Sequence, residues 1–530
     1  MKISINQALR SGIFAHKKGK FDEAEYFYQT ILQIQPNHPN ANHNLGILKV
    51  SINKSKLSLP FFKKATEVNK HNEQFWISYI NTLIKERQFD NVKESCKKAL
   101  AINSSFIIIY NIFANFEKEL GRFKEAEIIY KKAIKIKPKF AVTHFNFANL
   151  LKKLGRLEEA EASYKKAIKI KPELVDAHFN LSNTLLELNK LTEAEIHYKK
   201  TIKLKPDHIK AHCNLASTLN ELGRLEEAES NFSKALHINP DYKIALLGRG
   251  QILFDKKEFE LSLRDFDSCN TPDSRARALT SLYALKKIDD IYSRINKSAE
   301  LDDQNLRVAA FSTFITDKEK KDTTHKFCKK PMDFIHFSNI SSHLKNSEFF
   351  IEEVIEELNH INARWEPLGR TTHKGFHSGN KVSIFKSGQK KINKLQSIIF
   401  DELDLYKKKF KNETCSYIKK WPTKKYNLFA WYVILKSQGY QSAHIHPSGW
   451  LSGVIYLKVV PPLKKNEGSI EFDLSGQNYF NINSLKLNYQ PKVGDIVLFP
   501  SSLYHRTIPF TTDTDRIIVS FDLIPNTKNN

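Results

Sequence analysis

The hydrophobic and polar positions in the first half of the chain repeat with a period of 34 residues. A small Ala in each copy is followed four residues later by Tyr or Phe, and a Pro closes the copy. Apolar residues three and four positions apart predict amphipathic helices, and Pro cannot continue a helix, so each copy predicts a helix pair that ends near its Pro. The clearest copies are "GRFKEAEIIYKKAIKIKP" (121–138), "GRLEEAEASYKKAIKIKP" (155–172), "NKLTEAEIHYKKTIKLKP" (189–206) and "GRLEEAESNFSKALHINP" (223–240).

Further copies extend this array in both directions. The segment 19–36 keeps the register, and weaker copies fill about 39–106. After Pro240 the copy is degenerate, because Lys257 replaces the glycine. The pattern is similar to the tetratricopeptide repeat, whose helix pairs stack into a superhelix with a concave groove. The resemblance covers residues 5–276 and implies an all-α superhelix there, and we expect a capping helix and a linker over 277–330.

The second half of the chain has a different pattern. Amphipathic helices are expected at 346–365 and 391–410, with a loop over 366–381 between them. Later segments alternate apolar with polar residues, are rich in β-branched residues and are bounded by Gly or Pro, which predicts strands. Helices followed by strands predict an α+β domain with a β-barrel or double-sheet core, here over 331–526. The expected strands are 426–437, 442–447, 451–460, 468–474, 495–510 and 516–524.

The composition is that of a folded multidomain protein. Of its 530 residues, 41% are hydrophobic and 11% aromatic, which suffices for more than one core. No apolar run approaches the length of about eighteen residues that a membrane helix needs, so we expect a soluble cytoplasmic protein without a signal peptide. The 5 cysteines form no CxxC pair, which favours a reducing compartment over a disulfide framework or a thiolate zinc site.

The formal net charge of +25 is compatible with binding to nucleic acid. The lysines, however, are spread along the chain, and many lie in the repeated "YKKAIKIKP" phrases. A solvated helix face accounts for them, so we expect neither a nucleic acid nor a membrane as partner.

Asparagines recur in the first helices of the repeats, in "THFNFANLL", "AHFNLSNTL" and "AHCNLASTL". A carboxamide donates and accepts hydrogen bonds together, as a peptide backbone requires. In tetratricopeptide proteins this face lines the groove, and similar asparagine ladders hold extended peptides, so the resemblance implies a protein or peptide partner. Alternatively, some of these asparagines stabilise turns or neighbouring helices. Asn146, Asn180 and Asn214 share one repeat position, and Asn149 and Asn183 lie three residues further on the same helix face.

Candidate chemistry begins with "SAHIHPSGWLSGVIYL", in which His444 and His446 are one residue apart. On a strand this spacing places both side chains on one face, where they can serve one metal ion. Further on, "FPSSLYHRTIPF" contains His505, and Arg516 opens the last expected strand. If 504–508 and 515–521 form a hairpin, His505 and Arg516 share a face within about 7 Å along the strand.

This order of residues resembles the iron(II)- and 2-oxoglutarate-dependent oxygenases, in particular a bacterial family of that class. The resemblance covers roughly 331–526 and implies a double-stranded β-helix, or jelly roll. In that superfamily one strand end supplies a His-x-Asp or His-x-Glu pair, a later strand supplies a second His, and an Arg or Lys follows about ten residues on. Carried over, His444 and His505 are iron ligands, and Arg516 pairs with the distal carboxylate of 2-oxoglutarate.

The chain departs from the superfamily at one ligand, because His446 stands where a carboxylate is usual. The common face of two histidines and one carboxylate would then contain three histidines. Three arrangements remain open. All three histidines bind iron; or two bind and water completes the site; or a carboxylate such as Glu471 or Asp473 reaches in.

The resemblance implies an Fe(2+) enzyme that uses dioxygen and 2-oxoglutarate to hydroxylate a substrate. We expect that substrate to be a protein or peptide captured by the repeats, by analogy with the pairing of such repeats with hydroxylases. Two alternatives are a non-enzymatic scaffold with an inactive barrel and a three-histidine cupin-type dioxygenase. The cupin phrase requires a Glu soon after HxH, which "PSGWLSG" lacks. Other candidates for the pocket are Trp365, His373, His377, Trp431, Tyr432 and Trp450, although loop histidines are usually solvated and barrel aromatics usually belong to the core.

Overall fold

A computed structural model describes residues 4–367, 371–379, 382–422, 426–476, 478–479 and 483–525. Two compact units, residues 1–206 and 207–530, can be separated by their internal contacts. No helix in the described ranges combines the length and the apolar character that crossing a membrane requires. The 5 cysteines are all free.

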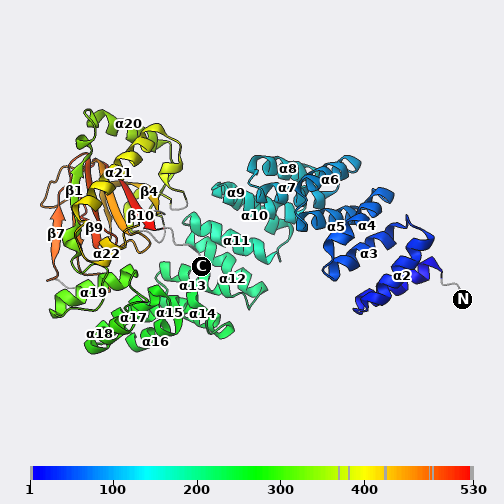
Figure 1. Cartoon of the computed structure of the whole chain (residues 1–530), viewed down its shortest axis with the longest axis horizontal. Helices are drawn as coiled ribbons and strands as arrows, with labels where there is room; N and C mark the ends of the chain where they lie inside the picture. The colour runs from blue at the N-terminus through cyan, green and yellow to red at the C-terminus, as the bar shows by residue number, and fades with distance from the viewer. Residues whose placement is uncertain are drawn as a thin grey trace. The chain divides into compact units, whose positions relative to one another are not determined.

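The first unit consists of helices in antiparallel pairs, coloured blue to cyan in Figure 1. The small and aromatic positions of the repeat are its core, since Ala126, Tyr130, Ala160 and Tyr164 have no exposed surface. Close helix contact at each Ala leaves room for the aromatic ring one turn later. The helices are α1 (Ile5–Lys17), α2 (Phe21–Ile34), α3 (Pro39–Ser51), α4 (Ser55–Val68), α5 (Glu73–Lys85), α6 (Phe89–Ile102), α7 (Ile107–Glu119), α8 (Phe123–Ile136), α9 (Ala141–Lys153), α10 (Leu157–Ile170), α11 (Val175–Glu187) and α12 (Leu191–Leu204).

The turn inside each pair explains the repeated Gly. Gly121 and Gly155 have φ values of 77° and 76°, in the left-handed region that glycine enters without steric cost. In less regular copies Asn189 and Lys257 take this conformation, at 60° and 66°. The degenerate copy after Pro240 therefore keeps the turn even though it lacks the glycine.

The second unit begins with more helices, and the first four of them continue the paired pattern. Ser262 and Phe266 are buried at the positions that the repeat predicts. Fold class and repeat type are thus confirmed for the first half of the chain. The helices are α13 (Ile209–Glu221), α14 (Leu225–Ile238), α15 (Lys243–Asp255), α16 (Phe259–Cys269), α17 (Pro272–Ala284), α18 (Ile288–Lys297) and α19 (Leu306–Glu319).

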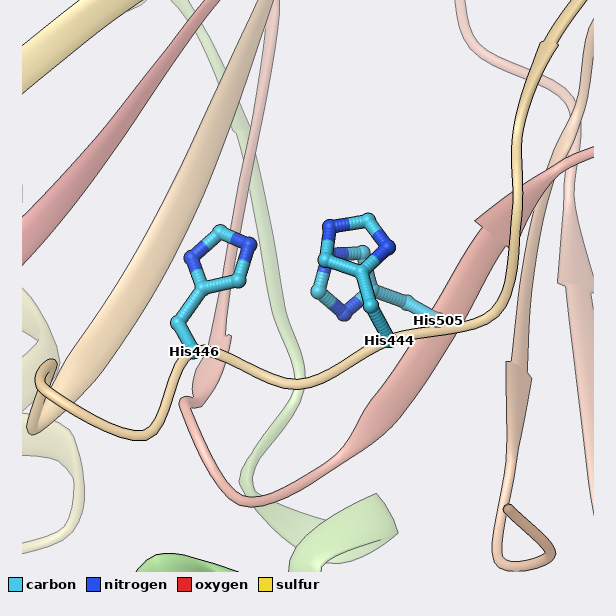
Figure 2. Close-up of side chains that lie close together, drawn as sticks. All are labelled: His444, His446 and His505. Carbon is cyan, nitrogen blue, oxygen red and sulfur yellow. The ribbon is translucent and has the colours of Figure 1, made fainter. Parts of the chain in front are cut away.

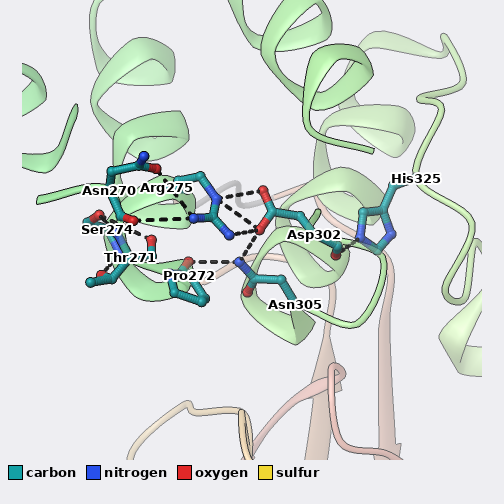
Figure 3. A network of polar contacts seen from close by, with 8 residues as sticks. All are labelled: Asn270, Thr271, Pro272, Ser274, Arg275, Asp302, Asn305 and His325. Atoms are coloured by element: carbon teal, nitrogen blue, oxygen red, sulfur yellow. Dashed lines mark hydrogen bonds and ion pairs between the residues drawn. The ribbon is translucent and has the colours of Figure 1, made fainter. Parts of the chain in front are cut away.

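A buried polar network ties the start of α17 to the chain on either side of α19 (Figure 3). Arg275 donates to the Asp302 carboxylate, with Nη2 2.7 Å from Oδ1, and only 1% of the Asp302 surface is exposed. The backbone carbonyl of Asp302 accepts from His325 Nε2 at 2.9 Å. Two residues later, Phe327 is fully buried in the core beside the sheet. The segment after α19 therefore contacts both the helices, through His325, and the core beside the sheet, through Phe327. The predicted domain boundary over 277–330 stays a prediction.

The C-terminal half contains two antiparallel sheets. The larger sheet has the order β1-β8-β5-β10-β4-β3-β2, and the smaller has β7-β6-β9. This is the expected jelly-roll type of α+β domain, and it includes α20 (Ser347–Asn359), α21 (Lys390–Lys409) and the short α22 (Ser416–Lys419). The strands are β1 (His336–Asn339), β2 (Ala363–Trp365), β3 (Thr372–Ser378), β4 (Tyr426–Gln441), β5 (Leu451–Lys458), β6 (Ile470–Asp473), β7 (Lys486–Tyr489), β8 (Asp495–Pro500), β9 (Tyr504–Thr507) and β10 (Arg516–Pro525).

The two faces of the large sheet have different partners. On β10, Ile517, Val519 and Phe521 belong to the core that includes residues of α20 and α21. Ile518, on the other face, packs with Phe472 of the small sheet. Because side chains alternate along a strand, the remaining even-numbered residues of β10 point into the space between the sheets.

Three strand-level predictions are wrong. The expected loop 366–381 contains β3, and the helix expected to reach residue 365 ends at Asn359, before β2. The expected hairpin of 504–508 with 515–521 does not form, because β9 pairs with β6 while β10 pairs with β4 and β5. Tertiary pairing decides these elements, and short apolar runs do not specify their partners.

Candidate active site

Three histidines meet where the two sheets face each other. His444 and His446 follow β4 in the segment that leads to β5, and His505 lies in β9. The backbones of His444 and His505 form a β-bridge, each N–H donating to the other carbonyl at 3.1 Å. One potential ligand atom from each ring lies within 4.8 Å of the others. Figure 2 shows the His444 and His446 rings on the same side of their segment, beside His505.

Each of the three rings has an acceptor at Nδ1. His444 Nδ1 lies 2.7 Å from the Ser442 carbonyl, His505 Nδ1 lies 3.2 Å from the Leu503 carbonyl, and His446 Nδ1 lies 2.6 Å from Asp522 Oδ1. Since these oxygens only accept, Nδ1 carries the proton in each neutral ring, and the Nε2 lone pairs remain available. The cluster therefore has the tautomers that a metal site requires.

Burial favours the neutral form of His444 and His505. The pKa of His444 is lowered to about 3, mainly by burial and secondly by the neighbouring His446. Burial also lowers the pKa of His505 well below its usual value, again assisted by the two other histidines. Neutral imidazole is the form that binds a metal, so these two rings can bind one without first losing a proton.

Asp522 places a carboxylate next to His446, the residue that stands where the superfamily usually has a carboxylate ligand. Its Oδ1 accepts from His446 and also from Ser452 Oγ, at 2.7 Å. Gly449 makes this packing possible, because a Cβ there would lie 2.6 Å from Ser501 Oγ and 3.2 Å from Asp522 Cγ. Sequence reasoning missed Asp522. The available signal was a charged residue inside the apolar strand "RIIVSFDLI".

The two carboxylates named as possible ligands lie elsewhere. Glu471 accepts from Arg506 at 2.7 Å, and Asp473 is bonded to Ser475 and Ser484. Both alternate along β6 with Phe472, which lies opposite His505 in the strand register. They therefore extend from the other face of the small sheet, away from the cluster.

Arg516 lies in the same interior. It lines a narrow pocket together with the three histidines and Tyr456. Only 1% of its surface is exposed, and its Nε donates to the Gly468 carbonyl at 3.2 Å. Its Nη1 is buried without a hydrogen-bond partner in the described part of the chain. Burial lowers the pKa of the guanidinium, so an anion beside it would remove an electrostatic penalty.

The guanidinium of Arg516 lies over the Tyr456 ring, with Cζ 5.0 Å from the ring centroid. The Tyr456 hydroxyl is likewise buried and has no hydrogen-bond partner among the described residues. Burial raises the pKa of Tyr456 to about 12, so this hydroxyl keeps its proton and can donate it in a hydrogen bond. A buried cation and a neutral donor side by side suit a carboxylate.

A larger cavity of about 670 Å³ opens from His444 and His446. Its lining includes Trp431 and His377, both candidates from the sequence. Tyr432 and Trp450 belong instead to the core next to the helices. His373 stacks on Tyr440, with centroids 4.5 Å apart, and Trp365 is 44% exposed on β2.

The asparagines of the repeats have internal partners. Asn149 Oδ1 accepts from the Tyr164 hydroxyl at 2.5 Å and from Asn180 Nδ2 at 2.9 Å. Asn183 Oδ1 accepts from the Tyr198 hydroxyl at 2.6 Å. Asn146 Nδ2 donates to Asn111 Oδ1 at 3.2 Å, and Asn214 stands at the equivalent position of α13. The ladder thus contributes to packing within the repeats, and peptide binding by it stays a prediction.

Jelly-roll sheets, an interior histidine cluster and a preceding array of helix pairs define the class of this protein. Family models agree with that description. Residues 429–522 match the family described as "Putative 2OG-Fe(II) oxygenase". Tetratricopeptide repeat models match within residues 108–242. The chain is therefore a tetratricopeptide repeat protein fused to a 2OG-Fe(II) oxygenase-type domain, as the sequence motifs predict.

Some solved structures similar to this chain are described as TPR proteins. YrrB, described as a TPR protein with an unusual peptide-binding site, is 23% identical, with 36% of this chain and 97% of YrrB covered and a TM-score of 0.32. PilF of Pseudomonas aeruginosa is 18% identical, with 41% and 97% covered and a TM-score of 0.34. A repeat protein of Cytophaga hutchinsonii is 16% identical, with 45% and 98% covered and a TM-score of 0.38. No curated protein sequence matches the chain.

Proposed function

We propose that this protein is an iron(II)- and 2-oxoglutarate-dependent dioxygenase that hydroxylates a protein or peptide held by its repeats. The observation that carries the proposal is the buried Arg516, with its unpaired Nη1, in the same pocket as three histidines with available Nε2 atoms. A cupin-type dioxygenase has no use for such an arginine. An inert scaffold has no need to bury a guanidinium without a carboxylate partner among the described residues, which costs several kcal/mol.

The residues present fit both implied groups. His444, His446 and His505 would hold Fe(2+) through Nε2, and Arg516 with Tyr456 would hold the distal carboxylate of 2-oxoglutarate. Bound iron supplies the activation of dioxygen that couples decarboxylation of 2-oxoglutarate, to succinate and carbon dioxide, with hydroxylation of the substrate.

The chain's own residues set the conditions for this chemistry. Asp522 accepts the Nδ1 proton of His446, which fixes the ring orientation and makes Nε2 a better donor. A site of three neutral histidines has no negative charge among its direct ligands. The Asp522 carboxylate would supply that charge through its hydrogen bond with His446. Arg516 would fix the direction of the diacid, and Trp431 lines both the narrow pocket and the larger cavity.

The experiment is anaerobic loading with Fe(2+), followed by 2-oxoglutarate and oxygen, with succinate as the readout. Ala at any of the three histidines should reduce iron occupancy and succinate together, whereas His446→Asp should retain iron. Arg516→Ala should retain iron but raise the 2-oxoglutarate requirement roughly ten- to hundred-fold, since a charge-assisted hydrogen bond contributes about 1.5–3 kcal/mol. Iron binding with no succinate would support the scaffold, and 2-oxoglutarate-independent oxygenation would support the cupin-type enzyme.

Substrate capture by the repeats has its own test. Simultaneous replacement of Asn146, Asn180 and Asn214 by Ala should weaken a verified peptide partner several-fold or more, because each side-chain hydrogen bond contributes about 0.5–1.5 kcal/mol. Uncoupled 2-oxoglutarate turnover should stay at the wild-type level. Unchanged affinity for that partner would reject peptide binding by these asparagines.

A cytoplasmic location, expected from the sequence, is part of the same proposal.

A further inference from the structure

Two arginines from the helical region line the same cavity as the histidines. Arg277 lies on α17 and Arg307 on α19, and the cavity that they line reaches His444 and His446. Phe311 and Phe314 of α19 pack against Tyr479, with ring centroids 4.9 and 4.7 Å apart. This aromatic contact joins α19 to the jelly-roll domain, so the arginines belong to a built wall of the cavity.

Arg277 and Arg307 both contact one carboxylate, that of Asp273. Arg277 Nε lies 3.1 Å from Asp273 Oδ2, and Arg307 Nε lies 2.7 Å from Oδ1 of the same carboxylate. Two guanidinium groups thus share one acid. The other charged residue among the described lining residues is Asp522, which is bonded to His446. Arg277, Arg307 and Asp273 together therefore have a formal charge of +1, and Asp522 offsets it for the cavity as a whole.

Both arginine side chains are accessible to a ligand in the cavity. Their side chains are 26% and 36% exposed, in a cavity of about 670 Å³. Arg277 Nε donates to Asp273, whereas Arg307 lies at ion-pair distance from the same carboxylate. A guanidinium has further donors, and its planar fork of donors matches a carboxylate. Arg277 also donates from Nη1 to Gln251 Oε1, which orients its side chain.

We propose that Arg277 and Arg307 select a polypeptide substrate with an Asp or Glu side chain close to the residue that is hydroxylated. The proposal rests on the proposed function and adds the substrate class. A polypeptide is favoured because the wall is formed by α17 and α19, which directly follow the last helix pair of the protein-binding type of repeat. An acidic side chain in the cavity would offset the formal charge of +1 that Arg277, Arg307 and Asp273 have together.

The test uses short synthetic peptide pools of randomised sequence in which one position is fixed as Glu or as Gln. Binding to the metal-free protein is measured by equilibrium dialysis, and succinate release by the iron-loaded protein is measured in parallel. Glu pools should bind the wild type about ten-fold more tightly than Gln pools and should stimulate succinate release. Arg277→Gln and Arg307→Gln should each reduce this preference, and Arg307→Lys should restore part of it.

The matched control is Arg264→Gln. Arg264 is exposed on α16 and does not line the cavity, yet its loss changes the net charge by the same amount. This control separates cavity binding from general attraction of acidic peptides to a chain of charge +25. It should keep the wild-type preference, and thermal unfolding should show that each variant is folded.

Equal binding of Glu and Gln pools by the wild type would overturn the inference, as would a preference that survives in the Arg277→Gln/Arg307→Gln double variant. Equal affinity for N-acetylglutamate and for the Glu pools would indicate a small acid as substrate and overturn the peptide assignment. The protein could instead prefer Glu pools in an arginine-dependent way and yet release no succinate, either with any pool or in the absence of peptide. That result would support the acidic-ligand site and refute the proposed oxygenase activity.

Discussion

Replacement of Asp522 by Asn tests whether the carboxylate next to His446 supports the proposed iron site. Asn has nearly the same volume, so the packing against Gly449 and Ser501 is preserved. The substitution removes the charge from an acceptor that lies 2.6 Å from His446 Nδ1 and 2.7 Å from Ser452 Oγ. A carboxamide can also present its NH2 group to Nδ1, which would move the ring proton to Nε2 and block the metal.

The expected magnitude follows from these contacts. Hydrogen bonds to a charged acceptor contribute about 1.5–3 kcal/mol and neutral ones about 0.5–1.5 kcal/mol, so the difference is about 1–1.5 kcal/mol. Loss of such a supporting acceptor typically weakens metal binding by about 10- to 100-fold. We expect Asp522→Asn to weaken Fe(2+) binding about ten-fold.

Anaerobic titration with Fe(2+), or with Co(2+) as a coloured substitute, measures this change. Glu471→Gln is the matched control, because Glu471 lies on the other face of β6 and is bonded to Arg506. It should keep the wild-type metal affinity. An Asp522→Asn variant with wild-type affinity, or a Glu471→Gln variant that loses the metal, would refute the reasoning.

Other predictions concern the fold. Asn149→Ala should destabilise the first unit by about 1–3 kcal/mol in chemical denaturation, because the buried Tyr164 hydroxyl loses its acceptor, and the cost should be smaller in a Tyr164→Phe background. Burial opposes ionisation of Glu402, but hydrogen bonds from His336, His343 and Ser338 outweigh it and lower its pKa to about 2. The unfolded value is about 4.3, so this stabilisation is present above that pH and is lost as the pH falls toward 2. Glu402→Gln should therefore flatten the stability profile between about pH 5 and pH 2. Limited trypsin digestion should cut first within 277–330, at the exposed Lys320 or Lys321; first cuts within 107–242 would contradict the predicted domain boundary.

The repeat half of the fold could be predicted from the sequence because its contacts are local. Ala126 and Tyr130 meet within one helix pair, and the same spacing recurs in every regular copy. The jelly roll was predictable as a class, but its pairing was not. His505 and Arg516 are close in sequence, yet their strands lie in different sheets and meet across the interior.

The candidate site likewise contains residues that the sequence could identify and residues that it could not. His444, His446 and His505 could be named from motif spacing, and the structure brings their rings together. Asp522 could not, because its role depends on β10 placing alternate residues beside the segment after β4. The cavity wall on α17 and α19 is likewise a tertiary feature, formed by residues in the segment for which the sequence predicts a cap and a linker.

The most direct test of the central claim is whether 2-oxoglutarate binds the iron-loaded protein through Arg516. Anaerobic addition of 2-oxoglutarate to wild-type protein containing Fe(2+) should produce a new visible absorption band, and admission of oxygen should then release succinate. Arg516→Ala should need roughly ten- to hundred-fold more 2-oxoglutarate for the same band, with iron content unchanged. Iron-loaded wild-type protein that gives no band with 2-oxoglutarate and no succinate with oxygen would contradict the account.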